Sequence, residues 1–180
     1  NISWFHEYLT SAKQGVRPLL PTLNICVRRE VIERVGLLNE DYPRAAGEDA
    51  EWTTRMRLAG FRLAFQPQAW VRHMPLSRST LRSVCRHAYT YGRYSIKVSA
   101  AFVDTLDTPW LLRHWLPLIL LSPFVSLGAA LRIFLADIAL WKHASTFPAV
   151  WISKMFWVLG AARTLRKHAV GEPVREGNTA

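Results

Sequence analysis

Cysteine is scarce in this sequence, and the two cysteines that it has form no recognisable site. Cys26 and Cys85 lie far apart in the 180 residues and have neither metal-ligand spacing nor partners in short loops. Small secreted proteins held by disulfides use several closely spaced cysteines, and zinc sites need Cys or His at short fixed spacings. The cysteine content therefore excludes a disulfide scaffold and favours a reduced, cytosol-facing domain.

Acidic residues are also scarce, and internal repeats and a signal peptide are lacking. Asp and Glu number 13 against 23 Lys and Arg, which gives a net charge of +10. Such an excess implies anionic partners, namely nucleic acid, acidic lipid headgroups or phosphate-bearing substrates, and charge alone does not choose among them. The chain begins at Asn1 without a basic start and apolar run, so we expect a processed or truncated start.

Apolar residues make up 50% of the chain and concentrate after residue 109. The segment 115–131 has 17 residues without a formal charge, which as a helix would cover roughly 25 Å. That length is slightly short of the hydrocarbon core of a bilayer, but Arg113 and Arg132 at its ends can extend outward to the headgroups. We therefore predict a membrane-spanning helix here.

A second apolar segment, 144–162, contains Lys154 near its middle. A charge is costly at mid-bilayer, so two alternatives stay open: the segment spans the membrane, or it lies in the interface as an amphipathic helix. Cations are more frequent outside the two segments than between them. By the positive-inside rule, this pattern predicts a hairpin with both ends in the cytosol. The remaining alternative is a hydrophobic hairpin buried in a soluble domain.

Local patterns predict short helices and strands in the first half of the chain. Apolar residues at helical spacing followed by glycine indicate two short helices, and alternating apolar and polar residues indicate two strands. A serine placed as an N-cap indicates a longer helix. The predicted elements are helices over 28–35 and 50–59, strands over 61–65 and 69–73, and a helix from Ser77.

Two adjacent carboxylates, Glu48 and Asp49, directly precede the second predicted helix. Backbone N–H groups and the helix dipole favour ionised carboxylates at that position. An ionised carboxylate at the end of a loop is a workable general base for a hydroxyl proton. The alternative is that Asp49 only caps the helix while Glu48 is solvated.

His73 ends the second predicted strand. A lone histidine at such a position is usually a surface or hydrogen-bonded residue, although its imidazole can complete a divalent-cation site built mainly from carboxylates. No aspartate pair suited to supply those ligands precedes it in this sequence.

The region from Asn24 to His73 resembles the second half of the catalytic domain of family-2 glycosyltransferases of the GT-A type. Those proteins show an Asn, an Arg-Arg pair and a short helix ending in Gly. A turn and a Glu-Asp pair that opens a helix follow, and then Arg, Gly, an aromatic residue, Pro and His. Each match alone is weak, but the ordered set is specific. Its members here are Asn24, Arg28, Arg29, Gly36, Glu40, Glu48, Asp49, Arg55, Gly60, Phe61, Pro67 and His73.

The resemblance implies roles for the residues of this stretch. Asp49 would be the base that deprotonates the acceptor hydroxyl, with Glu48 beside it positioning the acceptor. His73 would be a ligand to Mg²⁺ or Mn²⁺ on the nucleotide diphosphate. The candidates for substrate binding are Trp52, Arg55 and Arg93. For Trp52 a place in the core is favoured over sugar stacking, and for Arg55 a pairing with the loop carboxylates is favoured over substrate contact.

Two departures from the family pattern affect these expectations. Asn39 stands where the family usually has Asp, and the sequence lacks the nucleotide-binding half with its Asp-x-Asp motif. We therefore expect a fragment that is inactive alone and that shares its divalent metal with a missing N-terminal half. The expected fold is α/β, with a partial GT-A-like domain over 1–105, a membrane-associated helical hairpin over 106–168 and a polar tail over 169–180.

By the same resemblance, the parent protein would transfer a hexose with inversion from a nucleotide-sugar donor to a saccharide or lipid-linked acceptor. The predicted location is the inner cell membrane, with the catalytic part facing the cytosol. Membrane lipid is an expected partner, and nucleic acid is not.

The alternative function is that of a non-enzymatic, membrane-anchored basic module that binds anionic lipid or another protein. Its support is a basic ridge on the longer predicted helix, formed by Arg78, Arg82 and Arg86 with Arg93 and Lys97 beyond. Solvated cations are the default explanation of such a ridge. In the enzyme, the ridge would hold the phosphates of a lipid-linked acceptor.

Overall fold

The structure, a computed structural model, describes residues 14–42, 46–71, 80–102, 106, 108–136 and 138–170. They fall into two compact units, which we call the first unit (described residues 14–71) and the second unit (described residues 80–170), and we describe each by itself. This division follows how the chain packs. The predicted boundaries at residues 105 and 168 divide the chain by expected function, not by packing, and they stay a prediction.

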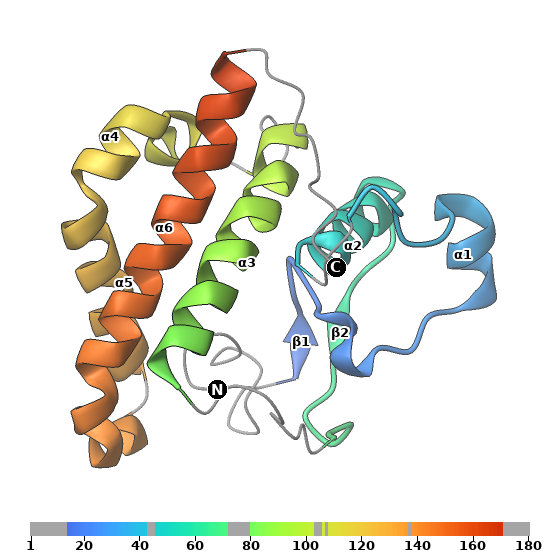
Figure 1. Ribbon diagram of the computed structural model, residues 1–180. Coiled ribbons are helices and arrows are strands. Elements are labelled where there is room, and N and C mark those ends of the chain that lie inside the picture. Colours follow the sequence, from blue (N-terminus) through green and yellow to red (C-terminus); the bar gives the residue numbers. More distant parts are fainter. Residues whose placement is uncertain are drawn as a thin grey trace. The chain divides into compact units, whose positions relative to one another are not determined.

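The first unit contains two short helices and a two-stranded antiparallel sheet (Figure 1). Its elements are β1 (Gly15–Val16), the 3₁₀ turn η2 (Thr22–Asn24), α1 (Arg29–Val35), α2 (Glu48–Leu58) and β2 (Ala64–Phe65). β1 pairs with β2, with Gly15 opposite Phe65. The buried core comes from both helices and from the chain that leads into β2: Val31, Trp52, Met56 and Leu63. This core fixes α1 against α2, the helix that carries the predicted carboxylates.

The second unit is a helical bundle. Its elements are α3 (Leu81–Ala101), η3 (Trp110–Arg113), α4 (Trp115–Leu120), α5 (Ser122–Ala136), η4 (Ile138–Thr146) and α6 (Phe147–Ala169). In Figure 1, α3 and α6 are long neighbouring helices that run in the same direction, and α4 and α5 lie along the other side of α6. Their shared core is made of Ile96, Leu118, Val158, Ala161, Ala162 and Leu165.

Two glycines let α3 and α6 touch backbone to backbone. A Cβ atom on Gly92 would lie 2.0 Å from the carbonyl oxygen of Trp157, and one on Gly160 would lie 2.1 Å from that of Tyr89. Because no side chain fits at such distances, glycine is required at both positions. Thr164 adds a polar tie to this seam, since its hydroxyl donates to the backbone carbonyl of Arg93 at 2.9 Å.

The predicted α/β, GT-A-like fold is wrong for the part of the chain that the structure describes. That part is mostly helical, and its strands form a two-stranded sheet without a GT-A-like sheet core. The alternating pattern over 61–65 yields only the two residues of β2, whose partner is the equally short β1. Strands of this length do not build a covered sheet, which needs longer apolar strands packed on both faces.

The predicted membrane-spanning helices, and the inner-membrane location that depended on them, are also wrong. Within the described ranges, no helix is both long enough and apolar enough to cross a membrane. The segment 115–131 does not form one continuous helix, because it divides at Leu121 into the six-residue α4 and the fifteen-residue α5. The second segment begins in η4 and continues from residue 147 in α6, which is 23 residues long and ends in a basic turn.

Candidate functional site

The candidate site lies at the start of α2. This helix begins at Glu48, and three of its first four residues are acidic: Glu48, Asp49 and Glu51. The N-cap residue, Gly47, has a left-handed backbone conformation with φ 100°, which favours glycine. The two helices predicted in this unit are thus confirmed within two residues at each end. The carboxylates belong to the first turn, where the helix dipole favours negative charge.

Asp49 is partly withdrawn from water. Burial raises the pKa of its carboxyl, while hydrogen bonds with the backbone of Ala50 and of Thr22 oppose that rise. One carboxylate oxygen accepts the N–H of Ala50 at 2.8 Å. The N-cap position itself belongs to Gly47, and no side chain caps it. A carboxylate with a raised pKa is a stronger base than an exposed one, as proton abstraction from a hydroxyl requires.

One carboxylate oxygen of Glu48 has no hydrogen-bond partner among the described residues, although the backbone of Glu48 and of Ala46 bonds to this carboxyl. That oxygen, Oε2, is buried. Burial, followed by the charge of Asp49, raises the pKa of this carboxyl. A buried carboxylate oxygen without a donor is unfavourable unless water or a ligand supplies one. The Glu48 side chain is therefore not simply solvated, and it offers an unfilled acceptor next to Asp49.

Tyr42 also belongs to the site, although the sequence analysis did not predict it. Burial raises the pKa of its phenol to about 12, and the nearby charges of Glu51, Asp41 and Glu48 act in the same direction. Its hydroxyl therefore stays protonated at neutral pH and can donate a hydrogen bond. An aromatic residue within a polar loop was the only sequence signal, and such residues are common in loops without a function.

Trp52 and Arg55 hold the chain that leaves α1. The indole N–H of Trp52 donates to the carbonyl of Gly36 at 2.9 Å. Arg55 donates to the carbonyls of Val35 at 2.6 Å and Leu37 at 2.8 Å. These three consecutive carbonyls belong to the end of α1, where helix carbonyls lack partners within the helix. We call this arrangement the α1 clamp.

The clamp is itself held in place by an ion pair. The guanidinium of Arg55 binds both carboxylate oxygens of Glu51, at 2.7 and 3.0 Å. The sequence had suggested loop carboxylates as its partners, but the partner is on its own helix, one turn away. The contacts of Trp52 and Arg55 with the backbone place both side chains in the scaffold of the first unit. Their predicted role in substrate binding remains untested.

Two further predicted site residues, Arg93 and His73, lie outside the described part of the first unit. Arg93 lies on α3 in the second unit, and its guanidinium sits 5.5 Å from the ring centre of Tyr94. His73 lies outside the described residues. Across the described ranges, no group of three or more His, Cys, Asp and Glu is arranged to hold a metal ion. The divalent metal stays a prediction.

Asn39, the residue that departs from the family pattern, has a defined local role. Its side-chain oxygen accepts the backbone N–H of Asp41 at 2.9 Å, which stabilises the turn that precedes the acidic residues. An aspartate oxygen at the same place would accept the same bond. The substitution therefore conserves the turn that the resemblance requires.

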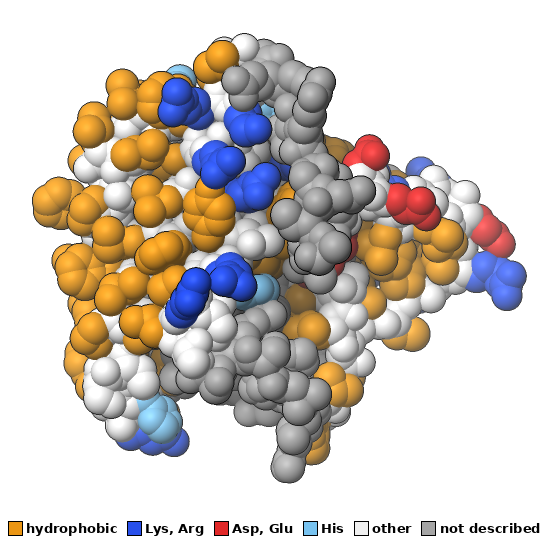
Figure 2. Space-filling model, viewed as in Figure 1, with side chains coloured by type: hydrophobic (Ala, Val, Ile, Leu, Met, Phe, Trp, Pro, Cys, Tyr) orange, Lys and Arg blue, Asp and Glu red, His pale blue; other side chains and the backbone are white. Residues whose placement is uncertain are grey.

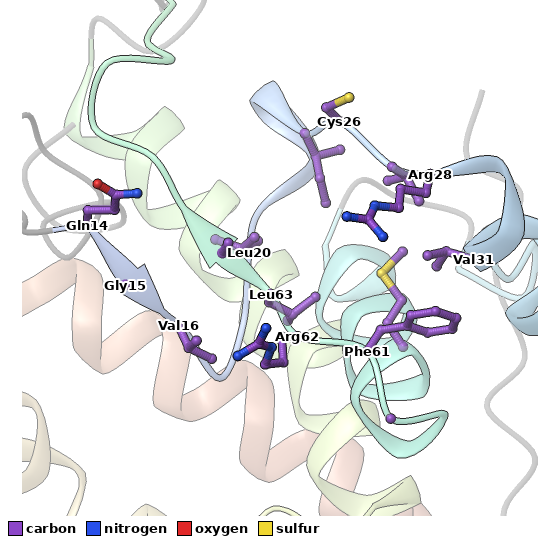
Figure 3. Close-up of a pocket in the computed structure, with 15 residues that line it drawn as sticks. Gln14, Gly15, Val16, Leu20, Cys26, Arg28, Val31, Phe61, Arg62 and Leu63 are labelled. Carbon is purple, nitrogen blue, oxygen red and sulfur yellow. The ribbon is translucent and has the colours of Figure 1, made fainter.

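A cavity of about 660 Å³ opens at the opposite end of α2. Figure 3 shows Arg28 and Arg62 among the apolar side chains that line it, including Val31, Phe61 and Leu63. None of the predicted site residues lines this cavity. The carboxylates and the cavity are thus separate features of the first unit.

Comparison with known proteins gives no relatives for this chain. No protein-family model, no curated protein and no solved structure matches it.

Proposed function

We propose that this chain is the acceptor-side part of a glycosyltransferase similar to family 2, which transfers a hexose from a nucleotide-sugar donor to an acceptor hydroxyl. The observation that carries the proposal is the buried, unpartnered Oε2 atom of Glu48 next to Asp49. A hydroxyl of the acceptor would donate to this pair of carboxylates. The ordered sequence resemblance from Asn24 to His73 adds independent support.

The proposed reaction is a single displacement. Asp49 takes the proton of the acceptor hydroxyl while its oxygen attacks the anomeric carbon. The bond from that carbon to the diphosphate breaks, and the nucleoside diphosphate leaves with the electron pair. Glu48 orients the acceptor, so that the attacking oxygen is held close to its target. A divalent metal would neutralise the leaving diphosphate, but the described residues provide no set of ligands for it, so no step here depends on one.

The clamp and Tyr42 would hold this arrangement. Arg55 and Trp52 fix the loop that leads from α1 toward the carboxylates. The protonated phenol of Tyr42 can donate to a neighbouring carboxylate or to a sugar hydroxyl. Rigid support matters because small displacements of catalytic groups reduce rates strongly.

Asp49→Asn in the full-length protein tests the proposal. Sugar transfer should fall about 100- to 10,000-fold, because the amide cannot accept the proton, while nucleotide-sugar binding stays unchanged. Asp41→Asn, a nearby exposed carboxylate, is the matched control and should keep full transfer. Unchanged transfer in Asp49→Asn would reject Asp49 as the base and leave the non-enzymatic basic module as the better account.

A further inference from the structure

The basic charge of the protein is concentrated in one part of the chain. Residues 76–180 contain 13 Lys and Arg against 5 Asp and Glu, whereas residues 1–75 contain 10 against 8. Among the described residues of the second unit there are eleven Lys and Arg and no acidic residue. By sequence, residues 76–180 carry a net charge of +8 (13 minus 5) and residues 1–75 carry +2 (10 minus 8), so the second unit attracts anions more strongly than the first.

Seven of the described cations of the second unit are exposed: four lie on α3 and α6, and Arg113, Arg132 and Lys142 lie on η3, α5 and η4. Arg82 and Arg86 are exposed on α3, and Arg163 and Arg166 are exposed on α6. The contacts of the α6 pair are with neutral groups: Arg163 donates to the Tyr89 hydroxyl at 3.0 Å, and Arg166 lies 5.5 Å from the ring centre of Trp115. Their positive charge therefore remains available to a partner.

Exposed apolar side chains continue from these cations. On α6, Phe156 and Leu159 precede Arg163 and Arg166 at steps of three and four residues, so all four share one face of the helix. In Figure 2, the Lys and Arg side chains border a broad hydrophobic area of the second unit.

The helices beside α6 enlarge the apolar surface. Leu120 on α4, Phe124 and Leu135 on α5 and Ile138 on η4 are 68, 72, 72 and 87% exposed. Trp110 and Trp141 are exposed as well. Contiguous exposed apolar side chains of this size mark an interaction surface.

We propose that the second unit binds the surface of an anionic phospholipid bilayer, through these exposed apolar residues and the cations on α3 and α6. Acidic headgroups match the net positive charge of the second unit, and the acyl region accepts leucine, phenylalanine and tryptophan. Nucleic acid matches the charge but does not bury such apolar residues, and a second copy of this unit would repel the first. The proposal concerns surface contact alone, and it does not depend on the proposed enzymatic activity.

Vesicle binding by the full-length protein tests this inference. Phosphatidylcholine vesicles with phosphatidylglycerol should bind the protein, and vesicles of phosphatidylcholine alone should bind it far less. The variant Arg82→Gln/Arg163→Gln/Arg166→Gln should lose about fivefold in affinity per cation, on the order of a hundredfold in all. Its matched control, Arg28→Gln/Arg29→Gln/Arg62→Gln, removes the same charge from the first unit and should bind nearly as well as the unmodified protein.

A second variant, Phe124→Ser/Leu135→Ser, tests the apolar part. Both side chains are exposed, so the fold should persist, which circular dichroism checks. Binding to anionic vesicles should weaken several-fold and become more sensitive to salt. Equal binding to both kinds of vesicle would overturn the proposal. Tight binding to duplex DNA without binding to vesicles would also overturn it. So would a protein that does not bind vesicles but forms a dimer, if Phe124→Ser/Leu135→Ser dissociates that dimer.

Discussion

The two units of this protein solve the problem of stability in different ways. The first unit adds polar ties from side chains to backbone carbonyls, with Arg55 and Trp52 of α2 as the donors, to a small apolar core. The second unit is held by close apolar packing, which includes backbone contact at Gly92 and Gly160. Polar ties leave room for buried carboxylates with raised pKa values, whereas the second unit has no described carboxylate. The difference suggests that chemistry resides in the first unit and surface contact in the second.

The largest expected effect comes from filling the contact between α3 and α6. Gly92→Ala puts a Cβ atom 2.0 Å from the carbonyl oxygen of Trp157, so the helices must separate. We expect a loss of about 3 kcal/mol or more in the free energy of unfolding of the second unit. Hydrogen exchange followed by mass spectrometry should show the loss in the second unit and an unchanged first unit.

Gly128→Ala is the matched control, because nothing lies within 4 Å of its Cβ position and it is also helical. It should stabilise the second unit by about 0.5–1 kcal/mol through the better helix propensity of alanine. A similar stabilisation in Gly92→Ala would mean that the two helices are not in close contact.

A smaller effect is expected from the partly buried cation of α6. Burial lowers the pKa of Lys154 to about 8 from its usual 10.5. Below about pH 8 the lysine is charged in both the folded and the unfolded state, and its burial lowers the free energy of unfolding. Above pH 10.5 the lysine is neutral in both states. Between these values the unfolded state binds more protons, so the free energy of unfolding should rise with pH.

Lys154→Met should remove this rise and stabilise the second unit by about 2–3 kcal/mol at neutral pH. Urea denaturation at several pH values measures both effects. Lys142→Met, at an exposed position, should leave the pH dependence unchanged. A pH dependence that is identical in Lys154→Met and the unmodified protein would show that burial of the lysine is not the cause.

The smallest effect is expected from the α1 clamp in the first unit. Arg55→Ala removes the ion pair with Glu51 and the donor to four acceptor atoms, which are both carboxylate oxygens of Glu51 and the carbonyl oxygens of Val35 and Leu37. Because this arginine is partly exposed, we expect a loss of about 2 kcal/mol in the first unit, measured by hydrogen exchange. Arg57→Ala, which loses a single bond to the Pro18 carbonyl, should cost about 0.5 kcal/mol. Equal losses in the two variants would mean that the contacts of Arg55 with the end of α1 do not stabilise the first unit.

Helix positions in the first unit were predictable from the sequence, and the sheet and bundle were not. Gly36 and Gly60 mark where α1 and α2 end, and both have the positive φ that favours glycine. The partner of β2 carried no signal, since β1 is only two residues long. In the apolar segments, Ser122 and Ser126 are buried within the bundle. A mostly apolar helix with a few small polar residues has the same sequence pattern whether it faces lipid or protein, so the bundle was not predictable.

The site was predictable in part. The placement of Glu48 and Asp49 at the start of α2 is confirmed, because adjacent acidic residues before a helical pattern are a local signal. The approach of Tyr42 and the partner of Arg55 depend on how the loop after α1 folds back, and no local pattern encodes that path. The catalytic roles of the carboxylates stay a prediction.

The most direct test compares two variants of the full-length protein in two assays. Asp49→Asn and Arg82→Gln/Arg163→Gln/Arg166→Gln are each measured for sugar transfer to a water-soluble acceptor and for binding to anionic vesicles. Asp49→Asn should lose transfer and keep vesicle binding, and the charge variant should keep transfer and lose vesicle binding. Loss of both activities in both variants, or full transfer by Asp49→Asn, would contradict the division of function between the two units.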